Sequence, residues 1–302
     1  MSDLTTAPPT GPDLPDSRRR ALRAHLMDEI HASPQPARRR RLMMMAAPAG
    51  VLAAVVAAGV IAGPWNDSVR PNPTTQVLAG DHDAALVFLD RLAAMAMARP
   101  ASGATEGRYL YVKSRIAYME FTDNDKGSLD ELHDREIWLP LFAGGKGRLK
   151  EVDRPTDLGV FTAERVQPDL PQDPDELLRK IYADSAGKGN SPDGQAFTVI
   201  GDLLGESMFP APTNAAIYQA AAKIPGVELV RDAVDATGRH GVAVAREELG
   251  ERREWIFDEA SGDYLGERSY LVEDKPYGKA GMITATTAVT ERGVVDRLGR
   301  KP

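Results

Sequence analysis

The stretch that decides the fold runs from Arg108 to Phe121 and reads RYLYVKSRIAYMEF. Apolar and polar side chains alternate along these 14 residues, which is the pattern of a strand with one buried face. One face would carry Leu110, Val112, Ile116 and Tyr118, and the other Tyr109, Tyr111, Lys113 and Arg115. At about 3.3 Å per residue, such a strand is roughly 45 Å long, well above the usual length of about five or six residues. A strand of this length predicts a wide, curved sheet.

Helices and further strands follow in separate blocks. We expect helices at 81–98, 174–182, 196–208 and 213–223, and strands at 134–142, 147–154, 227–234, 242–247, 253–258, 264–272 and 282–295. Asp173-Pro174 is a clear helix start, because aspartate caps a helix and proline suits its first position. The strand–helix alternation that is typical of parallel crossovers does not occur. The order predicts an α+β fold with a curved antiparallel sheet packed on helices.

A second stretch decides the organisation of the chain. Leu42–Gly63 holds 22 residues without a charged side chain and follows directly on the arginines of 38–41. A helix of this length rises about 1.5 Å per residue, reaches roughly 33 Å and can cross a hydrocarbon core of about 30 Å. The arginines would hold the N-terminal side in the cytoplasm. We therefore expect a single transmembrane helix. A cleaved signal of the twin-arginine type and a buried helix of a soluble protein are the alternatives.

The expected anchor divides the chain into parts of different charge. Residues 1–41, with a net charge of +3, are expected to be cytoplasmic and mostly disordered, with one short helix. Residues 64–80 are expected to form a linker, and residues 81–302 an extracytoplasmic α+β domain. Residues 64–302 have a net charge of −10, so the whole chain has −7. This acidic balance argues against nucleic acid as a partner, and the lipid bilayer, through Leu42–Gly63, is the first partner that we expect.

No catalytic, cofactor-binding or metal-binding residue can be selected from the sequence. The chain has no cysteine, which excludes disulfides, thiolate nucleophiles and thiolate metal sites. None of the five histidines forms a His-x-x-x-His pair. Residues 122–127 read TDNDKG but lack the ligand spacing of a calcium loop, so we interpret them as a solvated hairpin loop. We expect no enzymatic activity, no cofactor and no metal.

Eight aromatic side chains of the expected sheet allow two interpretations. They are Tyr109, Tyr111, Tyr118, Trp138, Trp255, Phe257, Tyr264 and Tyr270. They either line a hydrophobic cavity, or they pack the core of the domain against the helices. Aromatic residues on a sheet most often do the second.

Several stretches carry a resemblance to a known family. They are YLYVKSR at 109–115, REIWLP at 135–140, IPGV at 224–227, GVAVAR at 241–246, IFD at 256–258 with YLGER at 264–268, and GVVDR at 293–297. With the arginine-flanked anchor, they are similar to a large actinobacterial family of uncharacterised single-pass membrane proteins. Its members are often encoded beside extracytoplasmic-function sigma factors, which implies membrane-linked transcriptional signalling. The hairpin from Phe257 to Leu265 also resembles the half-barrel of lipoprotein carriers and of periplasmic regulators of anti-sigma factors.

These observations favour a membrane-anchored extracytoplasmic regulatory or sensor protein, an anti-sigma-like accessory without catalytic activity. The chain departs from zinc-binding anti-sigma factors, because it lacks cysteine and because about 41 cytoplasmic residues are too few for a complete sigma-binding domain. The alternative is an exported lipid- or lipoprotein-binding protein of the half-barrel type. A sigma factor or another membrane protein and a lipid ligand are the further partners that these hypotheses imply.

Overall fold

A large antiparallel sheet forms the centre of the structure, which is a computed structural model. It describes residues 72–99, 107–121, 127–151, 154–161 and 170–302, which belong to one compact unit, Asn72–Pro302. In this part of the chain the strands are β1 (Tyr109–Phe121), β2 (Gly127–Leu129), β3 (His133–Pro140), β4 (Lys146–Glu151), β5 (Arg154–Val160), β6 (Val227–Val234), β7 (His240–Glu248), β8 (Glu251–Phe257), β9 (Tyr264–Leu271) and β10 (Ile283–Val295).

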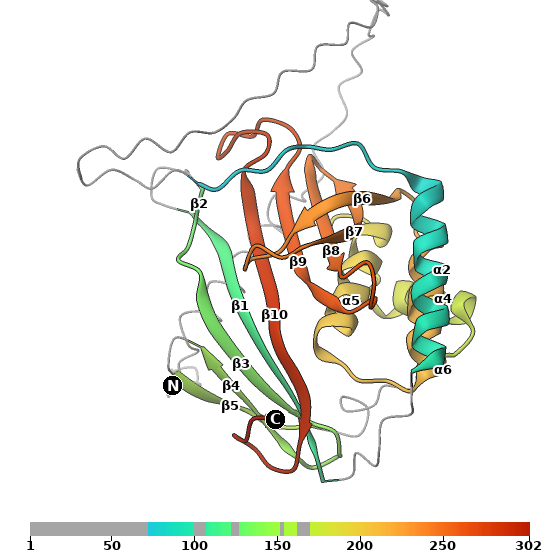
Figure 1. Cartoon of the computed structure of the whole chain (residues 1–302), viewed down its shortest axis with the longest axis vertical. Helices are drawn as coiled ribbons and strands as arrows, with labels where there is room; N and C mark the ends of the chain where they lie inside the picture. The colour runs from blue at the N-terminus through green and yellow to red at the C-terminus, as the bar shows by residue number, and fades with distance from the viewer. Residues whose placement is uncertain (1–71, 100–106, 122–126, 152–153, 162–169) are drawn as a thin grey trace, which may run out of the picture. The chain divides into compact units, whose positions relative to one another are not determined.

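The strands are hydrogen-bonded in the order β5-β4-β3-β1-β10-β9-β8-β7-β6, and β2 pairs with β1 (Figure 1). Each of these pairs is antiparallel. The long strand β1 therefore lies in the middle of the sheet, beside the equally long β10. The α+β class with a large antiparallel sheet, as predicted from the sequence, is confirmed.

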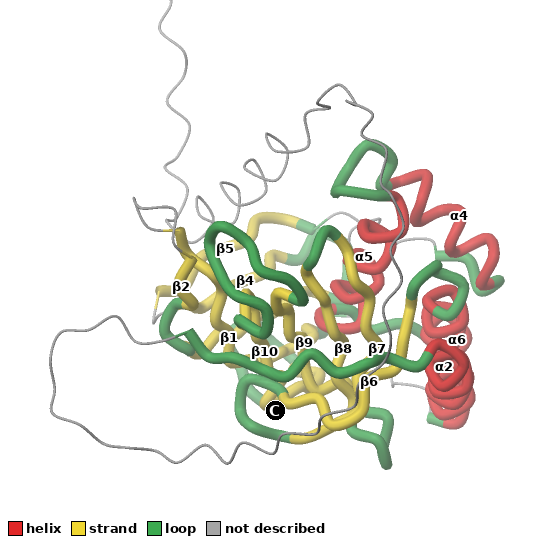
Figure 2. Tube along the Cα trace, turned by 90° about the horizontal axis from the view of Figure 1, so that it is seen from above, coloured by secondary structure: helices red, strands yellow, loops and turns green. Residues whose placement is uncertain are grey.

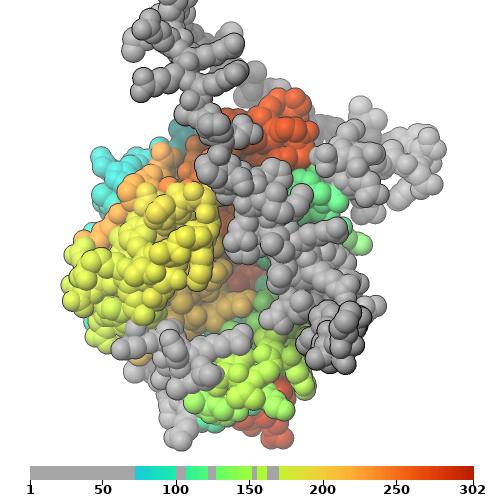
Figure 3. All heavy atoms as spheres, turned by 180° about the vertical axis from the view of Figure 1, so that it is seen from behind, coloured from blue at the N-terminus to red at the C-terminus, as the bar shows by residue number. Residues whose placement is uncertain are grey.

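Helices cover one face of the sheet, which we call the inner face. They are α2 (His82–Ala98), α4 (Pro174–Asp184), α5 (Pro192–Glu206) and α6 (Ala211–Ala221). Figures 1 and 2 show α2 and α6 packed side by side at the β6 end of the sheet, with α5 nearer its middle. Viewed from behind, α4 and α5 form part of the molecular surface (Figure 3). Asp81, Asp173 and Ser191 cap three of the helices by accepting hydrogen bonds from backbone N–H groups.

The main hydrophobic core lies between these helices and the inner face of β6 to β9. Its largest fully buried side chains include Trp255 and Phe257 of β8, Phe197 of α5 and Leu89 of α2. Phe197 stacks on Trp255 with ring centroids 3.7 Å apart. Burial of such large apolar side chains is the dominant stabilising contribution to a domain of this size. This core fixes α5 against the sheet, and α5 in turn defines the cavity described below.

The outer face of β8 and β9 carries buried charges in addition to the apolar side chains of Ile256 and Leu265. Arg268 donates two hydrogen bonds to Oε2 of Glu254, at 2.9 and 2.7 Å, and Tyr270 donates one to Oε1 at 2.7 Å. Glu254 is 0% exposed and Arg268 is 6% exposed. A buried charge is tolerated only when it is paired and hydrogen-bonded, and these contacts satisfy that requirement.

An extended segment, residues 72–80, covers these charges, and we call it the strap. Arg268 donates to the hydroxyl of Thr75 at 3.2 Å, and Arg252 donates to the carbonyl of Leu78. The backbone N–H of Thr75 donates to the carbonyl of Gly281 at 2.8 Å. The sequence placed these residues in a linker of residues 64–80 because of their composition. The described part of that segment instead lies along the sheet and belongs to the domain.

Strand β5 and the start of helix α5 are two of the places where the structure differs from the sequence prediction. Strand β5 was missed, because Pro155 and Gly159 are unusual within a strand; here Pro155 lies in an edge strand, where a missing N–H is tolerated. Helix α5 begins at Pro192, four residues before the predicted start. Ser191-Pro192 is a cap and first-position pair of the same type as Asp173-Pro174.

The predictions for residues 1–71 lie outside the described residues. These are the cytoplasmic segment, the transmembrane helix Leu42–Gly63 and the first part of the linker. Residues 122–126 of the expected hairpin loop are outside them too. Among the residues that are described, no helix is both long and apolar enough to cross a membrane.

Candidate functional site

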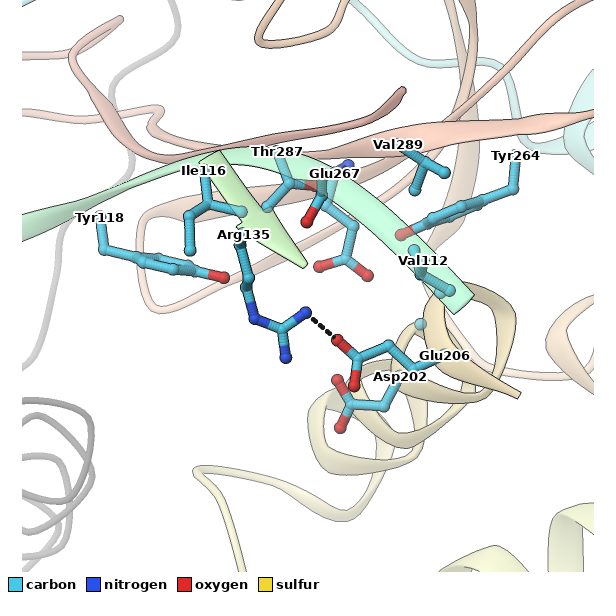
Figure 4. A pocket seen from close by; sticks show the side chains of 13 residues that line it. Val112, Ile116, Tyr118, Arg135, Asp202, Glu206, Tyr264, Glu267, Thr287 and Val289 are labelled. Carbon is cyan, nitrogen blue, oxygen red and sulfur yellow. Dashed lines mark hydrogen bonds and ion pairs between the residues drawn. The ribbon is translucent and has the colours of Figure 1, made fainter. Parts of the chain in front are cut away.

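A cavity of about 460 Å³ lies between the inner face of the sheet and α5. Its lining comes from β1, β3, β9 and β10 on the sheet side and from α5 on the other. The lining residues are Val112, Ser114, Ile116, Tyr118, Arg135, Gly201, Asp202, Gly205, Glu206, Tyr264, Glu267, Thr287 and Val289. Figure 4 shows the labelled side chains converging from the sheet and the helix on one space. The segments involved are up to 177 positions apart in the chain, so only the folded sheet brings them together.

Two glycines of α5, Gly201 and Gly205, face the sheet beside the cavity. Gly201 and Gly205 are four positions apart, which places them on the same face of a helix. A β-carbon on Gly201 would lie 2.5 Å from Oε1 of Glu267 and 2.6 Å from Nε1 of Trp255. On Gly205 it would meet its nearest atom, Cε1 of Tyr264, at 3.8 Å. The first glycine is needed for the close approach of helix and sheet, whereas the second leaves open space.

Polar contacts hold α5 in place around this space. At its start, the hydroxyl of Ser191 donates to Glu248 of β7. Near its middle, Arg253 of β8 donates to the hydroxyl of Thr198 at 2.7 Å. At its end, Arg135 of β3 forms an ion pair with Glu206 at 2.5 Å, drawn as the dashed line in Figure 4. The helix is therefore attached to three different strands, which keeps the cavity walls at a defined separation.

The cavity lining combines apolar side chains with polar and charged groups, and the sheet contributes both kinds. The strands β1 and β10 contribute the apolar side chains Val112, Ile116 and Val289. The helix contributes the carboxylates of Asp202 and Glu206, and β9 adds the carboxylate of Glu267. Apolar side chains together with a small number of placed polar groups are typical of sites for small amphipathic molecules.

Two of the carboxyl groups have raised pKa values. Protein atoms crowd around Asp202 at the cavity mouth, although its side chain is still exposed, and Glu267 and Glu206 lie nearby. Loss of hydration has the largest effect, and repulsion by the carboxylates of Glu267 and Glu206 adds to it, so the pKa of Asp202 is raised to about 7. The positive charge of Arg253 lowers this pKa in part. Burial also raises the pKa of Glu267. In the described part of the chain, Asp202 forms no hydrogen bond or ion pair, so no contact compensates for its charge.

The variant Asp202→Asn is expected to raise the melting temperature at pH 8. The pKa of Asp202 is higher in the folded protein than in the unfolded chain, so its ionisation destabilises the fold as pH rises from about 4 to 7. Asparagine removes this effect, and the difference from the parent should disappear near pH 4. Thermal unfolding at several pH values measures it, with Asp90→Asn on the exposed side of α2 as the matched control. If Asp202→Asn changed the melting temperature equally at all pH values, the raised pKa of Asp202 would be contradicted.

The two glycines of α5 should respond in opposite directions to the same substitution. Gly205→Ala meets only ordinary contacts and should stabilise the protein by about 0.5–1 kcal/mol, because alanine favours helix. Gly201→Ala forces its methyl group against the stacked indole of Trp255 and should destabilise it by about 1–3 kcal/mol. Urea unfolding of both variants measures this difference. Equal effects of the two substitutions would show that α5 does not approach the sheet at Gly201.

The structure divides the aromatic residues singled out in the sequence among three places. Only Tyr118 and Tyr264 line the cavity. Trp255 and Phe257 belong to the core under the helices, as the second interpretation predicted. On the outer face, Tyr111 packs with Trp138, and Tyr109 lies against them, while Tyr270 is buried beside Glu254. The first interpretation, a hydrophobic cavity lined by all eight aromatic residues, is therefore wrong. The cavity that is present is mixed in polarity, and two of the eight aromatic residues line it.

Sequence reasoning selected no site residue, so all of the charged lining residues were missed. Asp202, Glu206 and Glu267 are three of 44 acidic residues, and nothing in the sequence sets them apart. Within the described residues, no three histidine or acidic side chains are grouped so that they could hold a metal ion. A scan against protein-family models found no match to the chain, and a search of curated proteins found none either.

Proposed function

We propose that this chain is a membrane-anchored extracytoplasmic sensor protein whose folded domain binds an amphipathic molecule. The cavity beneath α5 carries this proposal. Its volume of about 460 Å³ falls within the range of roughly 300–1,000 Å³ that is usual for small-molecule sites. Its apolar side chains, Val112, Ile116 and Val289, suit an alkyl chain, and its carboxylates suit a head group. This combines the regulatory role expected from the sequence with the alternative of lipid binding.

The form of the sheet supports the lipid-binding part of the proposal. Strands β3, β1, β10 and β9 bend around the cavity while α5 closes it from the other side (Figures 1 and 4). We interpret this arrangement as a half-barrel with a helical cover, similar to that of lipoprotein carriers. Fold similarity alone does not imply function, so the argument depends on the cavity.

We propose binding without catalysis. The cavity lining contains no histidine, lysine or cysteine, so its candidate general bases are carboxylates. The hydroxyls of Ser114 and Thr287 lie in the lining with no imidazole beside them to activate them. Asp202 and Glu267 are then groups that recognise a ligand.

The signalling part of the proposal depends on the N-terminal sequence. The anchor at Leu42–Gly63 would place residues 1–41 in the cytoplasm, where a short helix can contact a sigma factor or another membrane protein. The full-length chain and a variant without residues 1–41 should be purified from cells that also produce the extracytoplasmic-function sigma factor proposed as the partner. Recovery of the sigma factor only with the full-length chain supports this role, and its absence from both contradicts it.

Native mass spectrometry of the full-length chain tests ligand binding. Protein extracted from its own membranes should carry a bound amphiphile, visible as added mass. Gly205→Phe fills the open space beside Tyr264 and should remove this added mass, whereas Ala94→Phe, at an exposed position of α2, should not. Circular dichroism checks that both variants are folded. A parent protein without added mass, or a Gly205→Phe variant that retains it, would contradict the proposed function.

A further inference from the structure

The charges of the cavity lining do not balance. Arg135 and Glu206 neutralise each other in their ion pair. The other two charged lining residues, Asp202 and Glu267, form no ion pair within the described residues, although Glu267 accepts a hydrogen bond from the hydroxyl of Tyr264. Arg253, which donates to Thr198, is the one other cation whose charge acts on both. The lining of the empty cavity therefore carries more acidic than basic side chains.

A buried donor next to Glu267 has no partner. Nε1 of Trp255 is fully buried and forms no hydrogen bond among the described residues. This N–H group and Oε1 of Glu267 both lie close to Gly201, at 2.6 and 2.5 Å from the position that a β-carbon on this residue would take. A buried N–H without an acceptor costs about 1–3 kcal/mol, so it needs an explanation. An ionised Glu267 attracts this N–H group more strongly than a protonated one, so a cation that keeps Glu267 ionised also favours the buried donor.

From these two observations we infer that the cavity selects amphiphiles whose head group is an ammonium, bound by the carboxylates of Asp202 and Glu267. This inference rests on the proposed function and names the chemical class of its ligand. The alkyl part lies along Val112, Ile116 and Val289, and the ammonium group neutralises the charge that the cavity leaves uncompensated. An anionic head group would face two carboxylates, and a neutral hydroxyl would gain only a hydrogen bond from them, without the attraction between opposite charges.

The charged groups around the site give this inference a pH dependence. The pKa of Asp202 is raised by Glu206 of its own helix and by Glu267 of β9, and it is lowered by Arg253 of β8. Arg135 of β3 forms its ion pair with Glu206 on the same helix. Since the pKa of Asp202 is about 7, this carboxyl group is mostly protonated at pH 6 and mostly ionised at pH 8. An alkylammonium ion, with a pKa near that of lysine, stays charged over this range. Binding of a cation should therefore strengthen by about tenfold from pH 6 to pH 8.

Calorimetric titration of the full-length chain with octylammonium, octanol and octanoate tests the inference. These probes share an alkyl chain and differ only in the head group. We expect octylammonium to bind at least about tenfold more tightly than octanol, and octanoate to bind most weakly. Asp202→Asn and Glu267→Gln should each weaken octylammonium by about tenfold and leave octanol unchanged. Asp90→Asn, an exposed carboxylate outside the cavity, should leave both unchanged.

Two contrary outcomes are distinguishable. If octanol or octanoate binds as tightly as octylammonium, or if Asp202→Asn and Glu267→Gln leave octylammonium binding intact, the ammonium preference is wrong while the cavity remains a binding site. If none of the three probes binds, the proposed function fails together with the inference. The unchanged octanol affinity of the two variants separates loss of charge from loss of structure.

Discussion

Replacing Arg268 by methionine is expected to lower the free energy of unfolding by about 3–5 kcal/mol. The substitution keeps most of the side-chain volume but leaves the carboxylate of Glu254 without its guanidinium partner. Glu254 is 0% exposed, so water cannot replace the two lost hydrogen bonds. The contact between Arg268 and Thr75 of the strap would be lost as well. Urea unfolding of the full-length chain at pH 7 measures the effect.

The exposed ion pair of Arg99 and Asp263 provides a matched control. Its atoms are 2.6 Å apart, close to the 2.7 Å of the buried pair, but its side chains are 52% and 61% exposed. Arg99→Met should therefore cost about 0–1 kcal/mol. The double variant Arg268→Met with Glu254→Leu should recover much of the lost stability, because it leaves no unpaired charge. If Arg268→Met costs no more than Arg99→Met, the strap does not bury this pair.

Phe257→Ala is expected to cost about 3–5 kcal/mol. The ring of Phe257 is 0% exposed and makes edge contacts with Phe88 of α2, Tyr218 of α6 and Tyr264 of β9. Removing the ring leaves a void where two helices and the sheet meet. These elements are packed against one another, so none of them can move by itself to fill the void. Urea unfolding again gives the magnitude. Since Tyr264 lines the ligand cavity, octylammonium binding should weaken in the same variant.

Phe121→Ala is the comparison for this prediction. Phe121 ends β1, is 58% exposed and contacts Tyr277 at a centroid distance of 5.5 Å. Its loss should cost about 1 kcal/mol or less, because little apolar area is buried there. Similar costs for the two variants would show that the helices do not pack on β8 as described.

The regular elements could be predicted because their signals are local. The alternation in Tyr109–Phe121 predicted β1 to within one residue, and Asp173-Pro174 marked the start of α4. Strand β6 was predicted at 227–234 and has these bounds. In each case the residues that determine the element are neighbours in the sequence, so periodicity and capping are sufficient.

The strap and β5 could not be predicted from such signals. Thr75 and its neighbours have the composition of a linker, and only the distant residues Arg252, Arg268 and Gly281 give them a place on the sheet. In β5, Pro155 argues against a strand unless the strand is known to lie at an edge. Ser191-Pro192 was a usable signal for the start of α5, and it was overlooked.

The cavity is a tertiary feature with almost no sequence signal. Arg135 and Glu267 come from strands that are more than a hundred residues apart in the chain, and raised pKa values depend on burial that no sequence shows. Gly201 and Gly205, four positions apart in a helix, were the one local hint. Glycine disfavours helix, so two on one helical face indicate a close approach or an open space.

Hydrogen–deuterium exchange of the full-length chain, with and without octylammonium, tests most directly whether the cavity beneath α5 is the binding site. Our account predicts that the ligand slows exchange in the peptides that contain α5, β9 and the middle of β1 and β10, and leaves α2 and β6 unchanged. Asp202→Asn should reduce this protection. Binding that slows exchange only outside these elements, or that protects the Asp202→Asn variant equally, would contradict it.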